Sequence, residues 1–291
     1  MRNLPSALWA ETLKMRRSKV PLFTSIGFLI LPLVGGLFMI ILKDPEAAKS
    51  MGLISTKAQI TAGTADWPAF FNLLTQGTAI GGMILFSIVT AWIFGREFSD
   101  RTIKELLALP TPRETTVSAK FIVIAGWTII LVIFMFIFGL IVGALVVIPG
   151  WSNELLSNAL INIIGSSVLN LMLLPYVALL ASTGRGYMPP FGWMILMVAL
   201  AQIAIVVGWG DWFPWAIPAL FAGAAGLRAE LLAMHSYVIV TITSIAGLAA
   251  TYYWWRNADH DKQRRPDRSG YQWKLYRFYR QPQWQQRHLP L

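Results

Sequence analysis

The chain contains no cysteine, which excludes a disulfide scaffold, thiolate metal sites, iron–sulfur clusters and cysteine nucleophiles. Its three histidines are scattered, and the sequence has no H-E-x-x-H or G-x-S-x-G motif. No Gly-Lys pair occurs anywhere, so the chain cannot build the phosphate-binding P-loop of an ATPase. We therefore expect no catalytic residue, no metal and no cofactor in this chain.

Charge is also scarce. Only 13% of the 291 residues are charged, whereas 56% are hydrophobic. An ordinary soluble domain has about 25% charged and about 45–50% apolar residues. The mean hydropathy of +0.57 points the same way. A water-soluble fold of this length could not bury so much apolar surface, whereas lipid solvates it. The composition therefore predicts an all-α, polytopic membrane protein.

Apolar runs of about 20 residues predict six transmembrane helices. The runs cover residues 22–42, 70–95, 121–148, 155–183, 188–208 and 236–255. Segment 209–233 is also apolar, but Pro214 and Pro218 interrupt it. Because a broken helix suits a membrane only where protein or water satisfies its backbone, we interpret this segment as a re-entrant or interfacial hairpin before the last span.

Lysine and arginine are distributed unevenly around the spans, and this bias sets the orientation of a membrane protein. Of the 24 basic residues, 20 precede the first span, follow the sixth, or lie in the second–third and fourth–fifth connections. Only Lys43, Lys49, Lys57 and Arg228 fall on the other side. The distribution predicts that both termini are cytoplasmic. The net charge of +10 then lies beside the membrane, and no nucleic-acid partner is needed to explain it.

The segment that precedes the first span is amphipathic. Apolar residues of 4–19 recur at helical spacing, while Glu11, Lys14 and Arg17 take another face. This pattern predicts a helix that lies in the cytoplasmic interface, because Trp9 and the leucines would otherwise face water. The alternative is a simple basic anchor before the first span.

The cytoplasmic loop at residues 96–120 combines dense charge with an apolar stripe. The stripe consists of Ile103, Leu106, Leu107 and Leu109. Ser99 or Asp100 could cap a short helix, which Pro110 and Pro112 would end. Exposed apolar faces often mark interaction sites. The residues alone leave two interpretations open: a docking site for a partner, or a helix that lies on lipid headgroups.

The predicted spans carry almost no ionisable residues, which argues against a proton relay. Their amide and hydroxyl side chains can either join helices or line a substrate path. Asn162, Ser166 and Asn170 are four residues apart and should share one face of the fourth span, and Gln202 lies in the fifth. We favour helix packing and retain these four residues as the candidate substrate path.

The order of these features resembles the membrane subunit of type-2 ABC exporters, and more narrowly the permeases of bacterial bacitracin-resistance and lantibiotic-immunity transporters. The likeness is strongest in the loop, which is similar to the family pattern E-x-x-x-G-T-x-x-x-L-L-x-x-P-x-x-R-x-x-x-x-x-x-K. The matching residues are Glu97, Thr102, Leu106, Leu107, Pro110, Arg113 and Lys120. Arg101 stands where the family usually has glycine. Less specific likenesses are ALWAETLKMRRSK, ASTGRGYMPP and DWFPWAIP.

The resemblance implies a permease domain at residues 1–255 in a bacterial cytoplasmic membrane, with an N-terminal elbow helix. The loop would be a coupling helix that docks on a separate P-loop ATPase, which would bind ATP and magnesium. The implied coupling residues are Glu97, Thr102, Ile103, Leu106, Leu107, Pro110, Arg113 and Lys120. Glu97 would orient the loop by pairing with a basic group, and Arg113 and Lys120 would hold its return at the headgroups.

The resemblance further implies a homodimer or heterodimer of six-span permeases that exports a hydrophobic or amphipathic substrate, such as an antimicrobial peptide or drug. Two alternatives stay open at this point. The chain could be a regulatory or sensory subunit that uses a permease-like fold without transporting, or the permease of an ion (sodium) exporter. A membrane-embedded enzyme is a third class, against which the missing acidic and histidine clusters argue.

The cytoplasmic tail at residues 256–291 is predicted to bind anionic membrane lipids. It carries nine basic and three acidic residues interleaved with aromatic side chains, and each Lys or Arg near such a surface contributes about 1 kcal/mol. A peptide of this sequence should therefore bind anionic vesicles in a flotation assay, less strongly as salt increases. Neutral vesicles are the control. A peptide that ignores anionic vesicles at physiological salt would contradict the prediction.

Overall fold

A computed structural model describes residues 4–44, 64–103, 105, 111–224 and 232–257 of the chain. Contacts divide the chain into two units, Met1–Arg256 and Asn257–Leu291. The described residues lie in the first unit, apart from Asn257. They form helices joined by turns, and no strand occurs among them.

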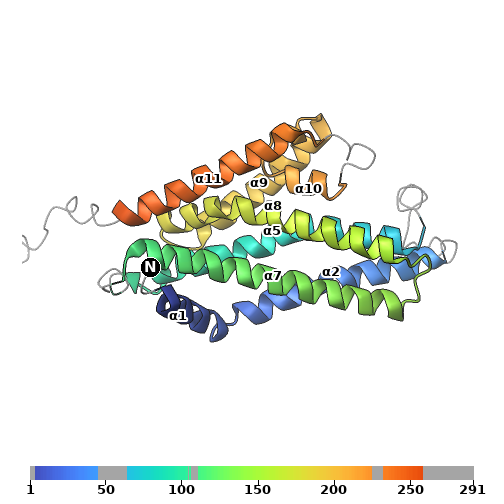
Figure 1. Cartoon of the computed structure of the whole chain (residues 1–291), viewed down its shortest axis with the longest axis horizontal. Helices are drawn as coiled ribbons and strands as arrows, with labels where there is room; N and C mark the ends of the chain where they lie inside the picture. The colour runs from blue at the N-terminus through green and yellow to red at the C-terminus, as the bar shows by residue number, and fades with distance from the viewer. Residues whose placement is uncertain (1–3, 45–63, 104, 106–110, 225–231, 258–291) are drawn as a thin grey trace, which may run out of the picture. The chain divides into compact units, whose positions relative to one another are not determined.

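Six helices are long and apolar enough to cross a membrane, as predicted from the sequence (Figure 1). They are α2 (Val20–Lys43), α5 (Trp67–Ser99), α7 (Arg113–Leu145), α8 (Asn153–Thr183), α9 (Met188–Val207) and α11 (Met234–Asn257). The protein is therefore an integral membrane protein. Its orientation in the membrane stays a prediction from the charge distribution.

Two of these helices extend beyond the predicted spans on the side of the charged loop. Helix α5 continues to Ser99, with Asp100 as its C-cap, and α7 begins at Arg113. Ser99 and Asp100 therefore end α5, and our expectation that one of them caps a loop helix was wrong. Hydropathy reports where apolar side chains end, whereas a helix can continue into the aqueous phase on its own backbone hydrogen bonds.

The starts of α5 and α8 follow from short polar side chains. The carboxylate of Asp66 accepts a hydrogen bond from the Ala69 backbone N–H at 2.9 Å, and the Ser152 hydroxyl accepts one from Leu155 N–H at 3.1 Å. Each side chain satisfies one of the unpaired N–H groups that every helix leaves at its start. These caps set where α5 and α8 begin.

Helix α5 is the central element, since it packs against α2, α7, α8 and α9, most extensively against α8. The rings of Phe28 from α2 and Phe86 from α5 stack with centroids 5.3 Å apart. Asn170 of α8 donates its amide N–H groups to the carbonyls of Thr78 and Ala79 in α5, at 3.3 and 3.0 Å. This side chain therefore joins two transmembrane helices.

A helix, α1 (Leu4–Arg16), forms where the sequence predicts one before the first span. It packs against α7 and exposes Trp9. Its Glu11 is buried, so part of the face that we expected to be solvated turns toward the protein instead. The position of α1 in a membrane interface stays a prediction.

Two short helical turns, η1 (Gly210–Trp212) and α10 (Ile217–Phe221), follow α9 where the sequence suggested a broken hairpin. Helix α10 packs against α8 and α5, and Ala216 and Ile217 are fully buried. Phe221 packs closely on α8, because a Cβ atom added at Gly165 would lie 2.5 Å from the Phe221 ring. Protein contacts therefore hold this segment, and its depth in a bilayer stays a prediction.

Replacing Gly143 by alanine should destabilise the fold. A Cβ at Gly143 would lie 2.3 Å from the ring of Trp67, which is buried against Phe70 and Phe71 and cannot move aside freely. Overpacking of this kind typically costs about 1–3 kcal/mol. We expect a lower unfolding midpoint for Gly143→Ala in detergent. The matched control is Gly126→Ala in the same helix, where nothing lies within 4 Å. Equal midpoints for the two variants would contradict this packing.

Candidate functional site

Four charged side chains from three helices meet at the end of the bundle that carries the charged loop. Glu11 and Lys14 come from α1, Glu97 from the last turns of α5, and Lys120 from the first turns of α7. We call them the charge cluster. Glu97 lies before the loop and Lys120 after it, so the cluster joins the two ends of the loop to each other and to α1.

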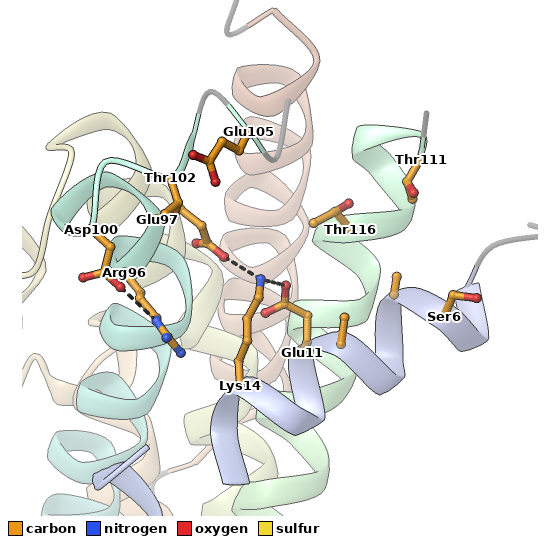
Figure 2. A pocket seen from close by; sticks show the side chains of 12 residues that line it. Ser6, Glu11, Lys14, Arg96, Glu97, Asp100, Thr102, Glu105, Thr111 and Thr116 are labelled. Carbon is orange, nitrogen blue, oxygen red and sulfur yellow. Dashed lines mark hydrogen bonds and ion pairs between the residues drawn. The ribbon is translucent and has the colours of Figure 1, made fainter. Parts of the chain in front are cut away.

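The ion pairs of the charge cluster form a closed ring. The Lys120 ammonium lies 2.7 Å from Glu97 Oε1 and 3.2 Å from Glu11 Oε2. The Lys14 ammonium lies 2.7 Å from Glu11 Oε1 and 3.1 Å from Glu97 Oε1, as Figure 2 shows. Lys120 also donates to the carbonyl of Ile93 at 2.8 Å. Each ammonium therefore contacts both carboxylates.

Most of the charge cluster is out of contact with water. The exposed fraction is 0% for Lys120, 4% for Glu97 and 7% for Glu11. Burial by itself lowers the pKa of Lys14, but the carboxylates of Glu11 and Glu97 outweigh it and raise that pKa above its ordinary value. The Lys14 ammonium is therefore charged at neutral pH. The cluster holds two positive and two negative charges, and this balance is what permits their burial.

Beside the charge cluster lies a cavity of about 500 Å³ between α1, the end of α5 and the start of α7. Its polar lining includes Arg96 and Asp100, which pair with each other at 3.0 Å, and Glu105, Thr111 and Thr116 (Figure 2). Glu97 lines it too, and its Oε2 is buried without a hydrogen-bond partner among the residues that the structure describes. Among the residues that the structure describes, no group of three His, Asp or Glu side chains could hold a metal ion.

The start of α7 also holds the end of the last helix. The guanidinium of Arg113 donates to the carbonyl of Arg256 at 3.2 Å, near the C-terminus of α11, where a positive charge is favourable. One turn further along α7, the hydroxyls of Ser118 and Tyr252 are 2.8 Å apart. The first turns of α7 therefore connect α1, α5 and α11.

The comparison with known families covers the helices that form this site. The family model of the ABC-2 family transporter proteins matches residues 7–208. The chain belongs to this family. It is also 26% identical, over 191 residues, to the bacitracin transport permease protein BcrB of Bacillus licheniformis, covering 61% of this chain and 85% of that protein. No solved structure matches the chain. We therefore describe it as the permease subunit of an ABC transporter.

The structure describes some of the loop residues that were predicted for the permease, whereas others lie outside the described residues. Glu97 does pair with basic groups, and its partners are Lys14 and Lys120, whereas neighbouring Arg96 pairs with Asp100. Thr102 is exposed beside the cavity, and Ile103 packs against the core. The expected anchors Leu106 and Leu107, with Pro110, lie outside the described residues.

Two basic residues at the return of the loop contact protein groups of the permease. We expected Arg113 and Lys120 at the level of the lipid headgroups. Lys120 is fully buried and pairs with the carboxylates of Glu97 and Glu11, and its depth relative to the headgroups stays a prediction. Arg113 contacts the C-terminal carbonyls of α11.

Arg101 has the conformation that the glycine of the family pattern would supply. Its φ of 59° lies in the left-handed region, which glycine adopts at least cost. The turn after α5 is therefore compatible with an arginine at this position.

The four candidate substrate-path residues are not brought together. Ser166 and Asn170 are buried in α8, whereas Asn162 and Gln202 are exposed on the outside of the bundle. Ser166 donates to the backbone carbonyl of Asn162, one turn earlier in the same helix. Residues spaced by four lie only approximately on one face of a helix. Over the length of α8 this line of residues rotates around the helix, so some of them contact a neighbouring helix and others face outward. The four side chains therefore do not share one surface of the single chain, and a substrate path through them stays a prediction.

Sequence reasoning missed Glu11 and Lys14 as parts of the site, since both were placed on a solvated face. The sequence nevertheless contained a signal for the role of these two residues. Opposite charges three residues apart lie on one side of a helix, and this helix has apolar residues around them. This pair precedes the first predicted span and could have been matched with Glu97 and Lys120, which are opposite charges within two residues of the predicted ends of the second and third spans.

Removing the buried ammonium of the charge cluster should destabilise the permease strongly. Lys120→Met leaves two buried carboxylates with only Lys14 between them, and breaking a buried ion pair costs about 3–5 kcal/mol. Adding Glu97→Gln to this variant should recover part of the loss, because it removes the uncompensated charge. Unfolding midpoints in detergent measure both effects.

The matched control for this variant is Asp100→Asn, which breaks the exposed pair with Arg96 four residues away. Exposed pairs of this kind contribute about 0.3–0.5 kcal/mol. If Lys120→Met lowers the midpoint no more than Asp100→Asn does, the cluster does not hold these helices together.

Proposed function

We propose that this chain is the transmembrane permease of an ATP-driven exporter, and that its loop between α5 and α7 is the contact with a separate ATPase subunit. The ATPase would bind ATP and magnesium, since this chain contains no P-loop. The observation that carries the proposal is the charge cluster, which ties both ends of that loop to each other and to α1.

The charge cluster supports this role because it makes the loop a stiff attachment. A force on a loop with independent ends would move only the loop. Here Glu97 and Lys120 are 2.7 Å apart, so the ends of α5 and α7 move as one unit, and Lys14 and Glu11 add α1 to it. Arg113 and Ser118 extend the same unit to α11. Movement of the ATPase would thereby reach four helices at once.

Membership of the ABC-2 family and the likeness to a bacitracin transport permease support a hydrophobic or amphipathic substrate, such as a peptide antibiotic, moved out of the cell or membrane. The permease would act as a dimer with a second six-span subunit. Faces of α2, α9 and α11 that are apolar and exposed in the single chain are available for this contact and for lipid. The charge distribution supports cytoplasmic termini.

Replacing Leu106 and Leu107 together by aspartate should abolish ATPase binding. Buried leucines contribute about 1.5–3 kcal/mol each, and both residues lie outside the six apolar runs of the sequence. The variant should insert normally but fail to co-purify with an ATPase encoded beside it. Cells that express both subunits should lose their protection from bacitracin, measured as the minimum inhibitory concentration.

The matched control is Leu145→Asp with Val147→Asp. These two exposed apolar residues lie at the opposite end of α7 from the loop, so their replacement should leave ATPase binding intact. A loop variant that still binds the ATPase and still protects cells would refute the coupling role. If the control variant binds the ATPase but no longer protects cells, its defect lies in transport and not in ATPase binding.

A further inference from the structure

A small cavity lies among α5, α8, α9 and the segment that joins η1 to α10. The volume within which the centre of a water molecule fits is about 10 Å³. Most of its lining is apolar, including Met83, Leu174 and Trp215. Ser87 of α5, Asn170 of α8 and Trp193 of α9 add three polar side chains, one from each of three transmembrane helices.

Two of these side chains present complementary unpaired atoms. The carbonyl Oδ1 of Asn170 is an acceptor, and the indole Nε1 of Trp193 is a donor. Both atoms are buried, and neither has a hydrogen-bond partner among the described ranges of the chain. A buried polar atom without a partner is costly, and more so inside a membrane, where lipid offers no hydrogen bond.

The side chain of Asn170 shows why its carbonyl stays free. Its amide nitrogen already donates to Thr78 and Ala79 of α5, and those contacts fix the plane of the amide group. The oxygen must then point away from those carbonyls. Rotating the amide to satisfy the oxygen would break both contacts, so the partner has to come to Oδ1 from the cavity.

We propose that this cavity binds one water molecule that links α8 to α9. The water donates one hydrogen to Asn170 Oδ1 and accepts the Trp193 indole hydrogen. Its second hydrogen is available to the hydroxyl oxygen of Ser87. The cavity meets both requirements for an internal water: volume for about one probe sphere, and two or more polar partners. Purely apolar cavities of the same kind stay dry.

The proposed water gives α9 a different kind of attachment from α8. Helices α5 and α8 are joined directly, by the two bonds from Asn170. The same side chain reaches α9 through a water, which can exchange or reorient without leaving a protein group unpaired. At this level α9 can therefore shift against the α5–α8 pair without breaking a direct bond.

Solid-state NMR of the full chain in lipid bilayers tests the proposal. Tryptophan is labelled with nitrogen-15, magnetisation is transferred from water to the indole N–H groups, and Trp193→Phe assigns the signal. We expect a water contact at Trp193. Trp255 is the control within the same sample, because its ring is buried and its indole N–H donates directly to the Ser182 hydroxyl at 3.0 Å. We expect no water contact there.

The variant Asn170→Leu keeps a side chain of similar size and removes the carbonyl. Loss of the water contact at Trp193, with the Trp255 signal unchanged, supports the proposal. A native Trp193 without a water contact overturns it, as does a contact that persists in Asn170→Leu. If that variant loses the native Trp255 signal, a density map of the unmodified protein decides. A water-sized peak within hydrogen-bond distance of Asn170 Oδ1 and Trp193 Nε1 supports the water, and its absence overturns it.

Discussion

The burial of Lys120 is the constraint on which the charged-loop end of this permease depends. A fully buried ammonium is tolerated only when carboxylates surround it, and here Glu97 and Glu11 do so from two other helices. The positions of these three helices are therefore set jointly, because α5, α7 and α1 cannot separate without breaking the ion pairs of the buried ammonium. Because Glu97 and Lys120 bracket the loop, the interaction that stabilises the fold also determines how the loop is held.

Away from the charge cluster, the helices are joined by weaker, neutral contacts. Asn170 donates to carbonyls of α5, Thr251 of α11 donates to the carbonyl of Pro175 in α8, and Trp255 donates to Ser182. This difference suits a transporter, since neutral contacts between transmembrane helices can be exchanged at lower cost than buried charges. The family match ends at residue 208, yet α11 contacts matched helices through these residues. The last helix is thus part of the same bundle.

The ends of α5 and α7 show what hydropathy can and cannot predict. The six spans were correctly predicted, because lipid requires about 20 apolar residues in each helix and the sequence has six such runs. The same reasoning placed the end of α5 at residue 95 and the start of α7 at residue 121, too close to the apolar segments. The extra turns contain Glu97 and Lys120, so the missed boundaries left these two residues of the site outside the predicted helices.

The sequence by itself determined that the chain is a six-helix membrane protein, where its charged loop lies, and that it lacks a P-loop, because these properties depend on composition and local order. Only the tertiary structure decided which polar residues meet. Glu11 and Lys14 were assigned to the charged face of an interfacial helix, yet α1 packs against α7, so that Glu11 pairs with Lys120 and Lys14 pairs with Glu97 of α5. Asn162, by contrast, shares the spacing of Asn170 but faces outward. Helical periodicity specifies the side of a helix on which a residue lies, whereas the neighbour on that side is chosen by the packing of the whole bundle.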